Sequence, residues 1–116
     1  MNDKTLEMAM LFDFFGDLLT EKQRTYFDLY YNDDLSLAEI AEQVDISRQG
    51  VRDVISRTEN ILREYEKKTG IVSRFMKMQA DISALENAVD QIVDMSDGDI
   101  KVVAENVKLK LQDLKG

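Results

Sequence analysis

No proline interrupts the 116 residues of this chain, and its five glycines stand singly, so few positions break a helix. Apolar residues, which make up 44% of the chain, recur at helical spacing along most of it. The pattern predicts an all-α fold of five or six helices. A chain of this length has a small core, so an exposed apolar helix face would need a partner.

Missing residue types narrow the function. Without histidine or cysteine, the chain lacks the usual general base, the usual zinc ligand, thiolate metal sites and disulfides. Carboxylate pairs lie only in polar turns, and there is no glycine-rich phosphate loop. We therefore expect a protein that is not an enzyme and uses no cofactor or metal. With no signal-peptide pattern and no apolar run of membrane-spanning length, we expect a cytoplasmic protein without membrane insertion.

The first thirty residues predict two helices. Residues 4–19 carry two adjoining apolar stripes, so we expect a helix with more apolar surface than one neighbour can cover. Thr20 and Gln23 have the spacing of a capping box, which predicts that a second helix starts there. That helix is expected to end in the acidic turn that begins at Asn32.

A helix-turn-helix is predicted from Ser36 to Leu62. Ser36 and Glu39 form a capping box for a short helix over residues 37–43, and Ser47 caps a longer helix after a three-residue link. At 100° per residue, the longer helix has an apolar arc and an opposite polar arc. The apolar arc comprises Val51, Val54, Ile55, Thr58, Ile61 and Leu62. The polar arc comprises Gln49, Arg52, Asp53, Ser56 and Asn60.

The polar arc has the chemistry to read bases, because Arg can bond guanine at two atoms and Gln or Asn can do the same to adenine. A net charge of −8 opposes binding to a polyanion. However, residues 48–77 hold eight basic and four acidic side chains, a local balance of +4 against −12 elsewhere. Asp53 is unfavourable near phosphate. An arc that is merely solvated is the alternative.

Three segments resemble region four of bacterial sigma factors, the part that reads promoter DNA. They are residues 18–24, 37–42 and 46–51. The whole chain resembles the YlxM-like family of small bacterial helix-turn-helix proteins more closely still. The motifs that carry this likeness are Phe12, Phe15 and Gly16 before the threonine cap, Asp-Asp-Leu-Ser at 33–36 and Ser-Arg-Gln-Gly-Val-Arg-Asp at 47–53.

The resemblance implies a DNA-binding regulatory protein linked to the signal recognition particle pathway, since such proteins are typically encoded beside that particle's GTPase subunit. Together with the polar arc, it gives the candidate nucleic-acid-binding residues. These are Ser47, Arg48, Gln49, Arg52, Ser56, Arg57, Lys22, Arg24 and Ser36. The expected partner is nucleic acid, in the first place DNA, or a component of the particle. The alternatives are a module that modulates the particle's GTPases without binding DNA, and an RNA-binding module.

Past Gly70 the apolar spacing alternates between four and three residues, which is typical of helices packed side by side. The seam of the helix over about 71–95 comprises Ile71, Phe75, Met78, Ile82, Leu85, Val89 and Ile92. After a turn at 96–99, the next seam comprises Ile100, Val103, Val107, Leu111 and Leu114. We expect the two seams to face each other in a hairpin over residues 71–116, appended to a helix-turn-helix unit over residues 1–70.

The predicted helices differ in how many apolar residues they present to one another. The first helix presents eight large apolar residues and the 71–95 seam seven, whereas the last helix offers five. Because some apolar surface is left over, we expect a homodimer whose recognition helices stay exposed. The candidate dimerisation residues are Phe12, Phe15, Phe75, Met78, Ile82 and Leu85.

Overall fold

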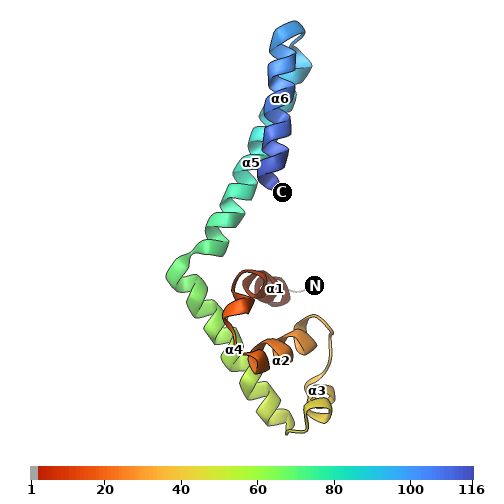
Figure 1. Ribbon diagram of the computed structural model, residues 1–116, viewed down its shortest axis with the longest axis vertical. Helices are drawn as coiled ribbons and strands as arrows, with labels where there is room; N and C mark the ends of the chain where they lie inside the picture. Colours follow the sequence, from red (N-terminus) through yellow and green to blue (C-terminus); the bar gives the residue numbers. More distant parts are fainter. Residues whose placement is uncertain (1–2) are drawn as a thin grey trace. The chain divides into compact units, whose positions relative to one another are not determined.

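The computed structural model describes residues 3–116, which form six α-helices and one 3₁₀ turn, without a strand (Figure 1). The elements are α1 (Asp3–Phe15), η1 (Gly16–Leu18), α2 (Glu21–Tyr31), α3 (Leu37–Val44), α4 (Arg48–Thr69), α5 (Ile71–Met95) and α6 (Gly98–Lys115). The predicted all-α class is thus confirmed. The chain divides into a first unit that ends at Val72 and a second unit, Ser73–Gly116.

Both predicted capping boxes are present. The Thr20 hydroxyl accepts the Gln23 N–H at 3.2 Å, and the Gln23 side chain accepts the Thr20 N–H at 3.0 Å. Ser36 and Glu39 make the same pair of bonds at 3.1 and 3.0 Å. These bonds satisfy amide groups that the first turn of a helix leaves without partners, so α2 and α3 begin where the sequence predicts.

The expected first helix over residues 4–19 is wrong at its end, because α1 stops at Phe15. The chain continues as the 3₁₀ turn η1, closed by a 3.1 Å hydrogen bond from the Leu19 N–H to the Gly16 carbonyl. Gly16 favours this break because it has low helix propensity, and it is buried beside the Phe12 ring. The turn leaves Leu18 exposed and buries Leu19.

The core of the first unit forms around α4, which contacts α1, α2 and α3 (Figure 1). All six residues of the predicted apolar arc are buried or half-buried. One cluster joins α1, α2 and α4 through Met8, Leu11, Phe15, Leu19, Phe27, Leu62 and Val72. The other joins α2, α3 and α4 through Tyr26, Ile40, Ala41, Val51 and Ile55. Because Val72 packs in the first cluster, this unit extends two residues past the boundary expected at residue 70.

Two aromatic residues predicted for dimerisation, Phe12 and Phe15, pack within this core. Phe15 is only 3% exposed. The half-buried ring of Phe12 stacks on Phe27 with 4.8 Å between centroids. The apolar excess expected on the first helix is therefore largely covered by α2 and α4 of the same chain.

The second unit is a hairpin of α5 and α6, turned at Gly98, whose φ of +63° favours glycine. Its buried side chains are Ile82, Val89, Ala104 and Leu111. The two expected seams do not face each other completely, because α6 packs through Ala104 and Leu111. A small residue such as Ala104 lets two helices approach closely, which turns Val103 away from the contact.

The predicted dimerisation residues in this unit have different surroundings. Ile82 is buried between the two helices of its own chain. Phe75, Met78 and Leu85 are 38%, 60% and 52% exposed. Across residues 3–116, no helix combines the length and hydrophobicity that crossing a membrane requires.

Candidate nucleic-acid interface

The link between α3 and α4 brings the starts of the two helices together. Asp45 ends α3 in the left-handed conformation, with φ of +59°, and the Ile46 N–H donates to the Ala41 carbonyl at 3.3 Å. The Ser47 hydroxyl then accepts the Gly50 N–H at 3.0 Å and caps α4. With only residues 45–47 between them, the helices form the tight corner of a helix-turn-helix.

A groove of about 620 Å³ lies at this corner. It is lined by Ser36, Leu37 and Ala38 from the start of α3, and by Ser47, Arg48, Gln49 and Arg52 from the start of α4. Five of the nine predicted binding residues therefore meet at one site. The start of a helix carries partial positive charge, so two starts beside two arginines form a surface that suits an anion.

The arginines of this part of α4 differ from most other cations of the chain. Within the described residues no ion pair involves Arg48, Arg52 or Arg57, and all three are exposed. By contrast, Arg63 contacts Glu7 at 2.9 Å, and Arg24 contacts Asp17 at 3.4 Å. Guanidinium groups that hold no carboxylate need not break an ion pair before they contact a phosphate or a base.

The acidic residue of the polar arc is hydrogen-bonded. The Gln49 side-chain amide donates to the Asp53 carboxylate at 2.9 Å, one helical turn along α4. An amide nitrogen has two protons, so Gln49 keeps one donor and its carbonyl acceptor for another partner. Asp53 therefore orients the Gln49 amide, in addition to placing a negative charge on the arc.

The other predicted residues lie outside this groove. Lys22 lies over the ring of Tyr26, 5.8 Å from its centroid, and Arg24 is in its ion pair with Asp17. Arg57 is exposed farther along α4. Ser56 shares a second pocket of about 310 Å³ with Arg52.

That second pocket also contains Glu59 and Lys4, which the sequence pattern does not mark as site residues. Glu59 is 7% exposed, accepts a hydrogen bond from the Tyr31 hydroxyl and lies 3.5 Å from the Lys4 ammonium group. Burial and the Glu59 carboxylate raise the pKa of Tyr31. The signal was in the helical spacing, because Glu59 lies four residues after Ile55 and three before Leu62, both buried. This cluster ties α1 and α2 to α4.

The site offers ionic and hydrogen-bonding groups and no metal ligands. Within residues 3–116, no three acidic side chains come close enough together to hold a metal ion, and the chain has no histidine or cysteine. What the groove can do chemically is bind an extended, negatively charged partner that also offers polar edges to Gln49 and Arg52.

Comparison with known proteins agrees with this geometry. Residues 2–102 match the model of the UPF0122 family, described as "Putative helix-turn-helix protein, YlxM / p13 like". A UPF0122 protein of Halalkalibacterium halodurans is 55% identical over 91 residues, which cover 78% of this chain and 84% of the relative. A UPF0122 protein of Shouchella clausii is 51% identical over 96 residues, 81% of this chain and 88% of the relative. The chain thus belongs to the UPF0122 family of YlxM- and p13-like helix-turn-helix proteins.

Proposed function

We propose that this protein is a cytoplasmic, non-enzymatic regulatory protein that binds DNA through the groove between the starts of α3 and α4. The observation that carries the proposal is the meeting of Ser36, Ser47, Gln49 and two unpaired arginines, Arg48 and Arg52, in that groove. Membership of a family of helix-turn-helix proteins supports it. So does the resemblance of residues 18–24, 37–42 and 46–51 to sigma region four.

In this proposal the start of α4 enters the major groove of the DNA, as in other helix-turn-helix proteins. Gln49 and Arg52 reach base edges, where a glutamine amide fits adenine and a guanidinium fits guanine. Ser36 and Ser47 contact the phosphates that flank the groove. Each serine oxygen accepts a capping bond, but its hydroxyl proton can still be donated to phosphate.

A net charge of −8 means that the whole molecule does not attract DNA over long distances. Affinity must come from the local arginines and should fall steeply with salt. The test is fluorescence anisotropy with a labelled pool of random 30-base-pair duplexes, titrated at several salt concentrations. Arg48→Ala and Arg52→Ala should each weaken binding about tenfold, and each should reduce the salt slope by about one.

Arg74→Ala is the matched control, because it removes the same charge from an exposed position in the second unit. It should leave affinity and slope close to those of the wild type. If the duplex pool does not bind at low salt, or if Arg74→Ala weakens binding as much as Arg52→Ala does, the groove is not a DNA site.

Asp53 gives a second readout. Asp53→Asn removes a negative charge but keeps a side-chain oxygen that can accept from Gln49. Affinity for the random pool should rise a few-fold, because repulsion from phosphate is relieved. Asp53→Ala should produce a similar rise but weaken discrimination between sequences selected from the pool, because Gln49 is no longer oriented.

The same resemblance extends the proposal to the signal recognition particle pathway and to a homodimer, which would suit two half-sites on DNA. The net negative charge favours the rival function, a module that acts on the particle's GTPases without DNA. A pull-down from cytosol with the tagged protein separates the two. Partners that are lost after DNase treatment support DNA binding, partners lost only after RNase indicate RNA, and partners that survive both support the rival.

A further inference from the structure

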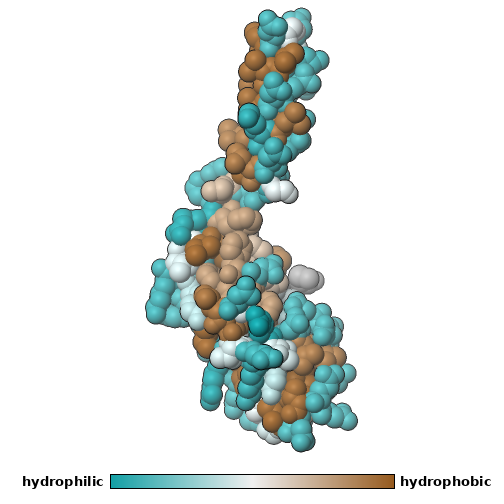
Figure 2. Space-filling model, in the orientation of Figure 1, coloured by the Kyte–Doolittle hydropathy of each residue, from teal (hydrophilic) through white to brown (hydrophobic). Residues whose placement is uncertain are grey.

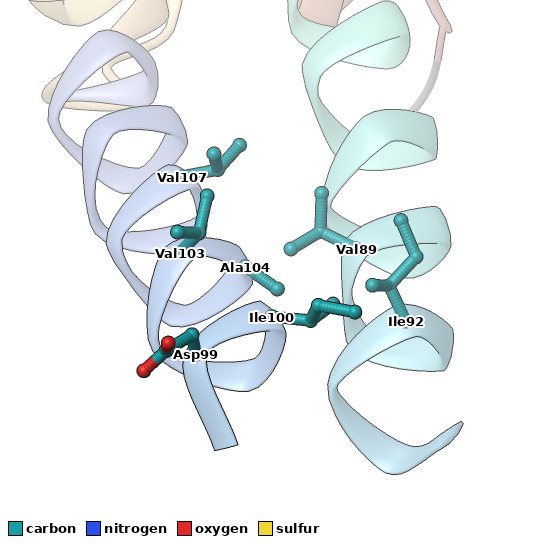
Figure 3. Close-up of a pocket in the computed structure, with 7 residues that line it drawn as sticks. All are labelled: Val89, Ile92, Asp99, Ile100, Val103, Ala104 and Val107. Atoms are coloured by element: carbon teal, nitrogen blue, oxygen red, sulfur yellow. The ribbon is translucent and has the colours of Figure 1, made fainter. Parts of the chain in front are cut away.

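The hairpin of the second unit has an open apolar side (Figure 2). A hollow of about 390 Å³ on this side is lined by Val89, Ile92, Asp99, Ile100, Val103, Ala104 and Val107. Figure 3 shows that its apolar side chains come from both α5 and α6, while the Asp99 carboxylate points away from them. No polar side chain reaches into the hollow, so it does not suit a charged or strongly polar ligand.

Helical spacing extends this hollow into a continuous face. Met78, Leu85 and Ile92 recur every seven residues on α5, and all three are exposed. On α6, Ile100, Val103, Val107 and Leu114 follow the spacing of three, four and seven residues, and they are also exposed. We call these seven residues the open face. None of them is charged.

The other edge of the hairpin is closed by ion pairs. The Lys108 ammonium group contacts the Asp90 carboxylate at 2.7 Å, and that of Lys115 contacts the Glu86 carboxylate at 3.2 Å. The two edges of the same hairpin thus have opposite chemistry. One satisfies its polar groups within the chain, whereas the other leaves apolar side chains in water.

The hairpin has too small a core to be stable by itself. Only four side chains are buried between its helices, one of them an alanine. Two helices in contact cannot surround a core, which is why stable bundles bury seams from three or four helices. The hairpin therefore needs a cover in every folded molecule, and a copy of the same chain is the one partner always present in equal amount.

We propose that a second copy of this chain covers the open face, so that two hairpins form a four-helix bundle. Seven residues that are each about half exposed leave on the order of 100 Å² apiece, or roughly 700 Å² per chain, which approaches the 800 Å² per partner of a standard interface. Residues 73–116 hold six basic and eight acidic side chains, so like-charge repulsion between two copies is weak.

This inference deepens the homodimer within the proposed function by naming its interface, and it does not depend on DNA binding. It places the contact on α5 and α6 and not on α1. It retains Met78 and Leu85 from the sequence prediction and adds Ile92, Ile100, Val103, Val107 and Leu114.

Two adjacent valines of α6 provide a matched pair for the test. Val103 belongs to the open face and is 62% exposed, whereas Val102 lies outside it and is 56% exposed. Sedimentation analysis of the full chain should give twice the 13.4 kDa chain mass for the wild type and for Val102→Glu. Val103→Glu should raise the dissociation constant at least about a hundredfold, because two-fold symmetry brings the charge into the interface twice.

A wild-type monomer at all concentrations would overturn the proposal. So would a dimer that Val103→Glu and Val102→Glu weaken equally, or one that neither weakens. Binding of duplex DNA by a folded monomer would leave the proposed function in place while removing this interface, so the two failures can be told apart.

A second measurement covers the case in which Val103→Glu unfolds the hairpin. The chain has no cysteine, so Lys110→Cys and Glu105→Cys each give a single site for a spin label. Lys110 lies seven residues after Val103, beside the open face, and Glu105 lies on another side of α6. Coupling between two chains should be strong at residue 110, within about two helix diameters or 20 Å, and weaker at residue 105. Equal or absent coupling at both sites would contradict the interface.

Discussion

The two units of this protein solve the same packing problem with different numbers of helices. In the first unit α4 contacts three other helices, and Met8, Phe27 and Leu62 are almost completely buried. In the second unit two helices bury four side chains and leave the open face in water. An amphipathic helix needs enough neighbours to cover its apolar stripe. The first unit finds them within the chain, and the second has to find them in another molecule.

The two units also differ in whether their exposed basic side chains form ion pairs. The first unit places its unpaired arginines on the side of α4 that does not contact the core, at the start of the helix. The second unit places two of its lysines, Lys108 and Lys115, in ion pairs at one edge of the hairpin. A surface that keeps its charges unpaired can bind a charged partner, whereas one that pairs them and exposes apolar side chains is suited to a neutral contact.

The largest effect on stability is expected from a charge placed in the core of the first unit. Val51 is fully buried between α3 and α4, so Val51→Asp should destabilise the first unit by more than about 4 kcal/mol, since a carboxylate would have no partner there. Val102→Asp is the control at an exposed valine of the second unit. Urea denaturation followed by circular dichroism measures both. A native midpoint for Val51→Asp would mean that α4 packs in another register.

Much of the fold could be predicted from sequence because the signals are local. A capping box needs two side chains three residues apart, and both boxes are present as predicted. The break after Phe15 could not be predicted, because it depends on Phe12 packing beside Gly16 and on the burial of Leu19. The expected seams contain three of the four buried hairpin residues, Ile82, Val89 and Leu111, but not Ala104, for a similar reason. Apolar spacing marks an arc of α6, but the small size of Ala104 decides which part of that arc contacts α5.

The next largest effect is a difference between the units in how their melting temperatures depend on protein concentration. All four tyrosines lie in the first unit and the chain has no tryptophan, so tyrosine fluorescence reports on that unit, whereas far-ultraviolet circular dichroism reports on both. If the open face is covered by a second copy, part of the dichroism signal should melt several degrees higher for each tenfold rise in concentration. The fluorescence transition should not move. Coincident transitions at every concentration would contradict a hairpin that depends on its partner.

A smaller effect is expected at the buried carboxylate of the first unit. Tyr31→Phe removes a hydrogen bond to Glu59 and should cost about 1–3 kcal/mol, because the buried carboxylate keeps only Lys4. Tyr30→Phe is the control. It removes a hydroxyl from the neighbouring tyrosine, whose ring packs edge-on against Tyr31, and leaves the bond between Tyr31 and Glu59 in place. Chemical denaturation at pH 7 measures the difference. Equal stability of the two variants would show that the bond to Glu59 contributes nothing.

The same variant should change the response to alkaline pH. Burial and the Glu59 carboxylate raise the pKa of Tyr31, so the folded chain keeps a proton that the unfolded chain releases above its usual pKa, near pH 10. Stability should therefore fall as the pH rises above about 10. In Tyr31→Phe this fall should be shallower, which a denaturation series from pH 8 to pH 11 would reveal.

The sequence predicts only part of the candidate site, as individual residues show. Ser47, Arg48, Gln49 and Arg52 follow one another at the start of a helix, so one helical arc is enough to collect them. Lys22 and Arg24 are predicted from their place at another helix start, but each has a partner within its own unit, Tyr26 for Lys22 and Asp17 for Arg24. A sequence shows which groups can bind an anion and does not show which of them already have a partner.

The smallest effect concerns the ion-paired edge of the hairpin. Asp90 raises the pKa of Lys108, so the pair contributes stability at neutral pH, and this contribution is lost as the pH rises through the pKa of the folded state. Both groups are partly exposed, and such pairs contribute little in water, so Lys108→Ala should lower the melting temperature by no more than about 2 °C at neutral pH. Lys101→Ala removes the same charge from an exposed position on the same helix and is the control. High salt should reduce the difference between the two variants, because it screens the pair. If Lys108→Ala instead disrupted the hairpin as strongly as Val103→Glu, the ion pairs and not the open face would hold the second unit together, and the contrast between the two units would have to be redrawn.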